Sequence, residues 1–165
     1  MKKFFPVVAT FTLILLADQA SKIFLDNFLV YGEHLNIFPG LSFQLIYNQG
    51  AAFGILSDQS GWQRWFLVLV STCISLVLIF WISKTVNTSK LECFSITFIL
   101  AGAIGNLLDR LIYGYVIDFI YVFYGDYSWP NFNIADSSVT IGMILFIIHS
   151  IYVEQKKTND ELTFK

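Results

Sequence analysis

Hydrophobic residues in this 165-residue chain gather in four long runs, at about 4–25, 64–83, 92–111 and 134–153. A helix needs about 20 apolar residues to cross ~30 Å of hydrocarbon, so each run is predicted to be a membrane-spanning helix. The second run is almost purely apolar, whereas the other three reach full length only by including polar residues at one end. The pattern predicts one integral membrane domain over 1–165, with polar groups carried into the bilayer.

The placement of lysine predicts how the spans are oriented, because cytoplasmic loops are enriched in Lys and Arg. The stretches 26–63 and 111–133 contain neither residue. We therefore expect both termini and the loop between the second and third spans to be cytoplasmic, and the loops 26–63 and 112–133 to lie outside. The first span also resembles a secretory signal, but no well-formed cleavage site follows it, and we expect it to be retained. Seven of the eight lysines flank the predicted cytoplasmic ends of the spans: Lys2, Lys3, Lys84, Lys90, Lys156, Lys157 and Lys165.

Outside the spans the hydrophobic pattern changes. Residues 41–48 partly alternate between apolar and polar positions, which predicts a short β-strand. The 111–133 stretch mixes aromatic residues with Gly114, Gly125 and Pro130, which predicts a short interfacial helix and turns. After the fourth span the chain is polar, and an irregular tail is expected.

Composition supports the membrane assignment and removes several other classes. Only 13% of the residues are charged, about half of the roughly 25% found in soluble domains, and 56% are apolar. This apolar content excludes a disordered chain, and a net charge of −2 gives no basic surface for a nucleic acid. Cys73 and Cys93 lie in or beside apolar runs without metal-ligand spacing, so we expect no disulfide scaffold, no metal and no cofactor.

Polar side chains from separate segments are predicted to meet at one depth near the outer leaflet. Asp18 lies fourteen residues beyond Phe4, and Asn106 lies fourteen residues beyond Glu92, or ~21 Å along each helix at 1.5 Å per residue. Both spans run outward, whereas the fourth runs inward and begins at this level. Ionisable groups are costly inside a bilayer and by default indicate a functional site. The candidate layer contains six residues: Asp18, Asn48, Asn106, Asp118, Asn133 and Asp136.

Several polar residues also have a purely structural interpretation. Asp18 and Lys22 are spaced i,i+4 and can form an ion pair that holds two helices together. Gly102 permits close helix approach, so Asn106 and Arg110 on the same face can be interhelical contacts as well as substrate contacts. The other ionisable groups considered are expected to be structural only: Asp109, Glu92, His34 and His149.

Two carboxylates remain as candidates for chemistry. The sequence has no G-x-S-x-G turn, H-E-x-x-H motif or suitably placed histidine, which argues against serine hydrolases and zinc peptidases. Asp118 and Asp136, close together in an apolar setting, cannot both ionise and would share one proton. The ionised carboxylate can then take a proton from water while the protonated one polarises a carbonyl oxygen. This is the arrangement of an aspartic peptidase.

Five motifs follow one another along residues 18–138. They are D-Q-A-S-K at 18–22, N-Q-G-A-A-F-G at 48–54, G-A-I-G-N-L-L-D-R-L at 102–111, G-Y-V-I-D-F-I at 114–120 and F-N-I-A-D-S at 132–137. Together they resemble lipoprotein signal peptidase, or signal peptidase II, a family of bacterial membrane aspartic peptidases. The resemblance implies that Asp118 and Asp136 are the catalytic pair. It implies supporting or substrate-binding roles for six further residues: Asp18, Lys22, Asn48, Asn106, Arg110 and Asn133.

The resemblance also implies a fold, a substrate and a location. The fold would be an all-α membrane protein of four transmembrane helices, with a small outer β-cradle and a short periplasmic helix over the site. The substrate would be a prolipoprotein whose lipobox cysteine carries diacylglycerol, cut just before that cysteine, and the antibiotic globomycin would block the enzyme. The expected setting is the bacterial cytoplasmic (inner) membrane, where a multi-pass monomer among membrane lipids would act near the outer leaflet without metal or cofactor.

Two other functions stay open from the residues alone. One is an intramembrane aspartyl protease of presenilin type, although its G-x-G-D signature is absent and Asp118 is expected in a loop. The other is a non-enzymatic small membrane carrier, whose polar groups should continue toward the cytoplasm. A cavity open only at the outer-leaflet side would separate these functions. Five aromatic residues are candidates for an apolar rim that holds acyl chains: Phe53, Phe119, Tyr121, Phe123 and Trp129.

Overall fold

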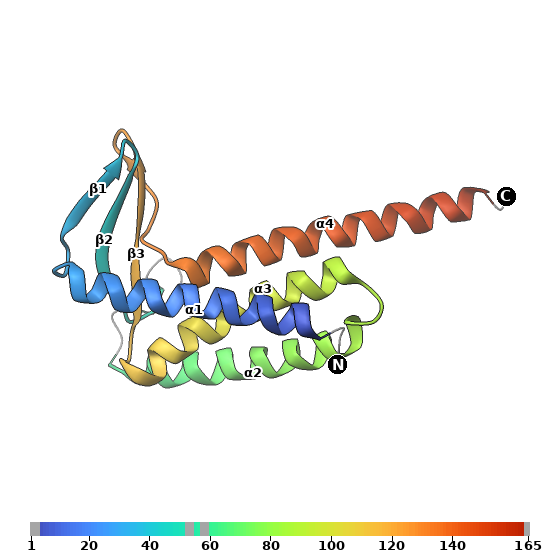
Figure 1. Ribbon diagram of the computed structural model, residues 1–165, viewed down its shortest axis with the longest axis horizontal. Coiled ribbons are helices and arrows are strands. Elements are labelled where there is room, and N and C mark those ends of the chain that lie inside the picture. Colours follow the sequence, from blue (N-terminus) through green and yellow to red (C-terminus); the bar gives the residue numbers. More distant parts are fainter. Residues whose placement is uncertain (1–3, 52–54, 57–59, 164–165) are drawn as a thin grey trace.

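The computed structural model describes residues 4–51, 55–56 and 60–163, without the side chains of 157–158 and 160–163. Within these residues four long helices form a bundle, and all four are long and apolar enough to cross a membrane (Figure 1). The four helices predicted from the apolar runs are therefore confirmed. The helices are α1 (Phe5–Phe28), α2 (Trp62–Thr85), α3 (Lys90–Ile112) and α4 (Ile134–Thr163). Residues named above that lie outside the description are Lys2, Lys3, Phe53 and Lys165, together with the side chain of Lys157.

The last helix is longer than its hydrophobic pattern indicates. α4 continues to Thr163 and projects past the other three helices (Figure 1). The expectation of an irregular tail was wrong for these residues. The sequence E-Q-K-K-T-N-D-E-L contains no glycine or proline to end a helix, and Glu, Gln, Lys and Leu are good helix formers.

α3 is the central helix and contacts the other three. Half of its membrane-capable segment is buried, against 17% for each of the others. Glycine allows the close approach: a Cβ on Gly102 would collide with the carbonyl oxygen of Ala135 on α4, and one on Gly105 would lie 2.6 Å from Oδ2 of Asp18 on α1. The predicted role of Gly102 in close helix packing is confirmed.

A four-stranded antiparallel sheet joins the helices at one end of the bundle, in the order β1-β2-β3-β4. The predicted strand at 41–48 is confirmed as β2 (Leu41–Asn48), and the others are β1 (His34–Phe38), β3 (Val116–Tyr124) and β4 (Tyr127–Ser128). The interfacial helix expected within 111–133 was wrong, because β3 occupies this stretch. Its residues V-I-D-F-I-Y-V-F-Y are mostly β-branched or aromatic and pair along β2. Between α1 and α2, and between α3 and α4, the described residues contain no helix that would correspond to the expected periplasmic one.

The sheet is anchored where α1 ends. Leu45 of β2 and both Ile117 and Phe119 of β3 pack with Leu25 and Leu29 in one buried cluster. Successive side chains of a strand point to opposite faces. The residue between Ile117 and Phe119 therefore points away from α1, and that residue is Asp118.

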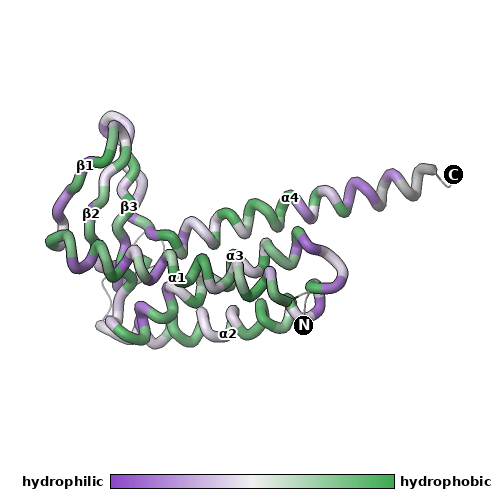
Figure 2. Tube along the Cα trace, in the orientation of Figure 1, coloured by the Kyte–Doolittle hydropathy of each residue, from purple (hydrophilic) through white to green (hydrophobic). Residues whose placement is uncertain are grey.

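Hydropathy follows this architecture. Hydrophobic residues run along all four helices, while hydrophilic residues gather at the α2–α3 connection and toward the end of α4 (Figure 2). The start of α1, the α2–α3 connection and the end of α4 lie at the end of the bundle opposite the sheet (Figure 1). This arrangement agrees with the topology inferred from lysine placement, and the side of the membrane that each end faces stays a prediction.

Candidate active site

Asp136 is held by the way α4 begins. Asn133 precedes the helix, and its Oδ1 accepts a hydrogen bond of 2.9 Å from the backbone N–H of Asp136. In return, Oδ2 of Asp136 accepts one of 3.1 Å from the backbone N–H of Asn133. These reciprocal bonds form a capping box, in which two helix-terminal N–H groups are satisfied by each other's side chains. Local helix capping thus fixes the direction of the Asp136 carboxylate.

Asp118 is held by a strand rather than by the loop expected from the sequence. It lies within β3, and it pairs with Ile46 of β2. Its Oδ1 accepts a hydrogen bond of 2.7 Å from Nδ2 of Asn133, and its Oδ2 accepts one of 3.1 Å from Nδ2 of Asn48. The side chain is 3% exposed. A rigid element and two carboxamides therefore position this second carboxylate.

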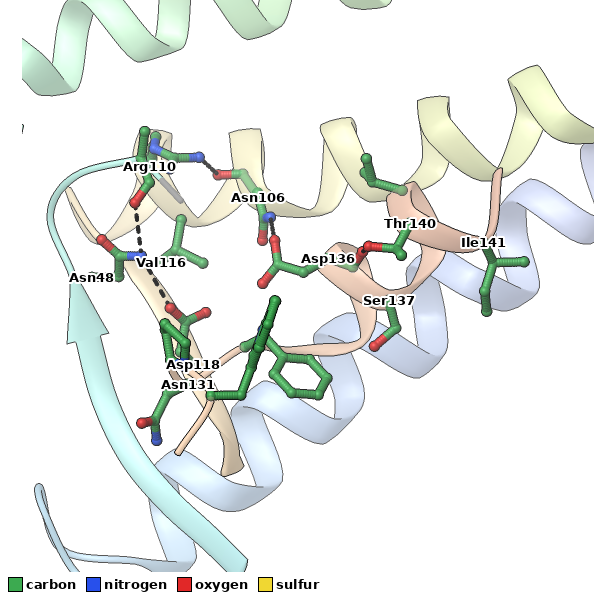
Figure 3. A pocket seen from close by; sticks show the side chains of 15 residues that line it. Asn48, Asn106, Arg110, Val116, Asp118, Asn131, Asp136, Ser137, Thr140 and Ile141 are labelled. Carbon is green, nitrogen blue, oxygen red and sulfur yellow. Dashed lines mark hydrogen bonds between the residues drawn. The ribbon is translucent and has the colours of Figure 1, made fainter. Parts of the chain in front are cut away.

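Two carboxamides connect the aspartates. Nδ2 of Asn106 on α3 donates to Oδ1 of Asp136 at 2.7 Å, and Oδ1 of Asn106 accepts from Nδ2 of Asn133 at 3.2 Å. Asn133 thereby contacts both Asp118 and Asn106, whose carboxamide donates to Asp136. Figure 3 shows the two carboxylates approaching one cavity from β3 and α4.

A buried ion cluster lies behind Asn106. Nζ of Lys22 is 2.9 Å from Oδ2 of Asp18, 2.8 Å from Oδ2 of Asp109 and 2.9 Å from Oδ1 of Asn106. Oδ1 of Asp18 also accepts from the backbone N–H of Ala135 at 2.8 Å, so α1 caps the first turn of α4. The predicted i,i+4 ion pair is confirmed, and it belongs to a larger network that joins three helices.

Arginine completes the wall of the cavity. Nη2 of Arg110 donates to the carbonyl oxygen of Gly50 at 2.8 Å, and this glycine follows a turn in which Oδ1 of Asn48 accepts from its N–H. Nε of Arg110 is buried and has no hydrogen-bond partner among the described residues. Arg64 of α2 donates to the carbonyl oxygens of Arg110 and Leu111 and so caps the end of α3.

The cavity has a volume of about 550 Å³. Its polar lining comes mainly from the residues described above, and its apolar lining comes mainly from the segment before α4 and from α4 itself, with Val116 of β3 beside them (Figure 3). Of the aromatic residues expected at the rim, Trp129 lines the cavity, whereas Phe119 is buried in the cluster against α1. Tyr121 and Phe123 stack on each other along β3 and are not among the lining residues. The apolar lining is Ala51, Val116, Trp129, Pro130, Phe132, Val139 and Ile141.

The surroundings of Asp118 favour its protonated form. Burial raises its pKa to about 7, the negative charge of Asp136 adds to the effect, and the hydrogen bond from Asn48 opposes it. Asp118 can therefore exchange a proton near neutral pH. Among the described residues, no group of three or more His, Cys, Asp and Glu side chains is arranged to hold a metal ion.

Comparison with known proteins identifies the family. A family model described as signal peptidase (SPase) II matches residues 10–152. The chain belongs to the signal peptidase II family. Its relatives include proteins named lipoprotein signal peptidase from Cellvibrio japonicus, 42% identical over 93% of this chain and 89% of that protein, and from Pseudoalteromonas translucida, 43% identical over 88% and 87%.

Solved structures share the fold of this chain. One described as "Bacterial membrane enzyme structure by the in meso method at 2.3 A resolution" is 31% identical. It has a TM-score of 0.82 and covers 92% of this chain and 91% of its own. A second, described in the same words at 1.9 A, is also 31% identical and has a TM-score of 0.74 over 87% and 91% of the two chains. Membership of this peptidase family removes the carrier and presenilin-type alternatives.

The structure brings together all eight residues predicted for the signal peptidase II site. They share one hydrogen-bonded network or line one cavity, from Asp18 on α1 to Asp136 on α4. Sequence reasoning missed Gln19, whose Nε2 contacts carboxylates of Asp18 and Asp109, and it missed the helix cap formed by Arg64. Gln19 lies inside the D-Q-A-S-K motif, and Arg64 is an arginine at the predicted outer end of α2, where positive charge is otherwise absent.

Proposed function

We propose that this signal peptidase II removes the signal peptide of diacylglyceryl-modified prolipoproteins by cutting just before the lipidated cysteine. Asp118 and Asp136 form the dyad that activates water. The observation that carries the proposal is their placement: they come from different elements, line one cavity of about 550 Å³ and are each held by carboxamides. The relatives named lipoprotein signal peptidase support the choice of substrate.

The dyad works with one proton shared between the two carboxylates. The ionised carboxylate takes a proton from water as the water oxygen attacks the scissile carbonyl carbon, and the protonated carboxyl donates to the carbonyl oxygen. When the C–N bond breaks, a proton from the dyad passes to the amine of the leaving cysteine. A pKa of about 7 for Asp118 supports this role, since the group must change protonation state at neutral pH.

The other polar residues of the site hold the dyad or meet the substrate. Asn48, Asn106 and Asn133 donate to the carboxylates and keep them in place. Nε of Arg110, buried without a partner in the described part of the chain, can donate to a carbonyl oxygen of the bound peptide. Lys22 and Asp18 act indirectly. Lys22 donates to Asn106, and Asp18 caps the first turn of α4.

The lipid serves mainly to position the substrate. The apolar lining from Trp129 to Ile141 can accept the start of an acyl chain while the rest stays in the bilayer. Acyl chains already in lipid gain little free energy on moving to protein, although each CH₂ removed from water is worth ~0.8 kcal/mol. Tethering the cysteine at the depth of Asp118 and Asp136 lowers the entropic part of the barrier instead.

The experiment is an in vitro cleavage assay that compares a prolipoprotein peptide with and without its diacylglyceryl group in the same detergent. Mass spectrometry should show the cut just before the lipidated cysteine. The unlipidated peptide should be cleaved with a lower kcat as well as a higher KM. A cut elsewhere, or equal kcat for both peptides, would contradict the proposal.

A further inference from the structure

Two carboxylates of the buried network, Asp18 and Asp109, do not line the cavity. Asp109 on α3 is 1% exposed and is not among the residues that line the cavity. Its Oδ2 is 2.8 Å from Nζ of Lys22 and accepts from the backbone N–H of Ile117 at 3.2 Å, while its Oδ1 accepts from Nε2 of Gln19 at 2.9 Å. Three donors from α1 and β3 thus converge on this one side chain.

The first of these contacts leads to Asp136. The ammonium of Lys22 has three hydrogens, and its three partners are Asp18, Asp109 and Oδ1 of Asn106. Because the positive charge faces Oδ1 of Asn106, the NH₂ of that amide is turned toward Asp136, to which it donates at 2.7 Å. If the amide rotated by half a turn, its oxygen would face a carboxylate oxygen. Lys22 therefore determines the orientation of Asn106, and Asp109 helps to hold Lys22.

The second contact leads to Asp118. Ile117 directly precedes Asp118 on β3, and its N–H is bound by Asp109 from α3. This bond fixes the start of β3 against α3. Beside it, Nδ2 of Asn133 donates both to the carbonyl oxygen of Ile117 and to the carboxylate of Asp118. The same carboxylate thus reaches both members of the dyad, each through one or two intermediate groups.

We propose that Asp109 is a positioning residue of the peptidase: through Lys22 and Asn106 it orients Asp136, and through the backbone of Ile117 it fixes Asp118. The proposal rests on the dyad of the proposed function. It assigns Asp109 no contact with the substrate or with the attacking water.

Asp109 also contributes to the charge around the dyad. The charged side chains of this buried cluster are Asp18 and Lys22 from α1 and Asp109 and Arg110 from α3, and Arg110 lines the cavity together with Asp118 of β3 and Asp136 of α4. Removing the negative charge of Asp109 makes loss of the dyad proton easier. Both pH limits of activity should then move to lower pH, an effect that the loss of a hydrogen bond alone would not produce.

The test measures kcat and KM of the full-length enzyme in detergent, with lipidated prolipoprotein peptide, across the pH range. Asp109→Asn keeps the size of the side chain and an acceptor for Ile117 but removes the charge. We expect kcat to fall about tenfold or more, because the reacting groups are misaligned. KM should stay within about twofold. Both limbs of the kcat profile should shift by about 0.5–1 pH unit toward lower pH.

Two further variants separate charge from position. Asp109→Glu keeps the charge but moves the carboxylate by one methylene, so kcat should fall while the pH limbs stay in place. Asp26→Asn is the matched control, because Asp26 is another carboxylate near the outer end of α1, and it accepts from the hydroxyl of Tyr47 on β2, away from the dyad. It should keep wild-type kcat and pH limbs.

Failure of the positioning role of Asp109 can be told apart from failure of the proposed dyad. If Asp118→Asn retains activity, the proposed function fails. If Asp118→Asn is inactive but Asp109→Asn has wild-type kcat, or has lowered kcat with unmoved pH limbs, the positioning role is overturned. Should Asp109→Asn not fold, Asp109→Glu decides: lowered kcat at unchanged KM supports the role, and wild-type kcat overturns it.

Discussion

The two ends of the bundle bury polar side chains in different ways. At the end that carries the sheet, buried polar groups bind partners on other elements, as Lys22 does to Asp109 and Asn106. In the other half, three buried hydroxyls donate within their own helices: Ser75 to the carbonyl of Ser71, Ser95 to Leu91 and Thr97 to Cys93. A hydroxyl satisfied by its own helix fixes no second element and offers little to a ligand.

The core reflects the same contrast. Away from the sheet it is a purely apolar cluster of residues from α1, α2 and α3: Val7, Leu78, Ile82, Cys93, Ile96 and Leu100. Ionisable groups meet there at the surface, where Nε2 of His149 lies 3.5 Å from Oε2 of Glu92 and both side chains are partly exposed. Helix packing alone builds one half, while a shared polar network builds the other, and the network is where chemistry is possible.

The largest effect should come from the dyad. Asp118→Asn and Asp136→Asn keep the shape of each carboxylate and one acceptor oxygen but remove its ability to exchange a proton. Each should lower kcat at least ~10²-fold, the scale of general acid–base catalysis, in a protein that still folds. Near-normal turnover of lipidated peptide by either folded variant would remove the dyad.

The buried ion cluster around Lys22 should contribute far more to the stability of the protein than the contact between Glu92 and His149 at the other end. Lys22→Met would leave Asp18 and Asp109 without their buried counter-charge and should destabilise the protein by about 3–5 kcal/mol. Glu92→Gln should lower stability by less than about 1 kcal/mol, because its partner His149 is partly exposed. Thermal unfolding in detergent measures both, and equal losses would contradict the distinction between the two ends.

Stability should depend on pH through Asp118. Its pKa rises from an ordinary value of 3.8 to about 7 because of burial and the charge of Asp136, so folding favours the protonated form. This contribution is complete below pH 3.8 and is lost as the pH rises through about 7. The unfolding temperature of the wild type should therefore fall over this range, and Asp118→Asn should fall less. If the unfolding temperatures of the wild type and Asp118→Asn changed in parallel with pH, a raised pKa of Asp118 would be contradicted.

The smallest effect should come from hydroxyls in the half away from the sheet. Ser95→Ala removes a hydrogen bond to the carbonyl of Leu91 within α3. We expect a loss of no more than about 1 kcal/mol in the free energy of unfolding, with kcat unchanged. A large fall in kcat would mean that the network of the site extends further along α3 than its contacts indicate.

Much of this arrangement could be predicted from the sequence, because hydrophobic runs and short motifs are local signals. The four spans follow from runs of about 20 apolar residues, and the depth of Asp18 and Asn106 follows from helical rise. The pairing of β2 with β3 could not be predicted from hydropathy alone. The aromatic residues of β3 are compatible with an interfacial helix as well as a strand, and only the partner strand decides.

The buried network was harder to predict than the dyad. Asp109 looks like a neighbour of Arg110 at the membrane edge, but helix geometry turns it toward Lys22 and Ile117 instead. Adjacent residues on a helix point about 100° apart, so contacts across elements depend on how α1, α3 and β3 dock. The capping box at Asn133 and Asp136 is a local signal that the sequence does contain.

The central claim is that Asp118 and Asp136 act as a pair that holds one proton. The most direct test is the pH profile of kcat/KM of the wild-type enzyme for lipidated peptide. A pair that must hold one proton loses activity when it gains a second proton and when it loses the first, so the profile should be bell-shaped around neutral pH. A profile that rises to a plateau and shows no decline at higher pH would mean that a single base acts alone, and would contradict the claim.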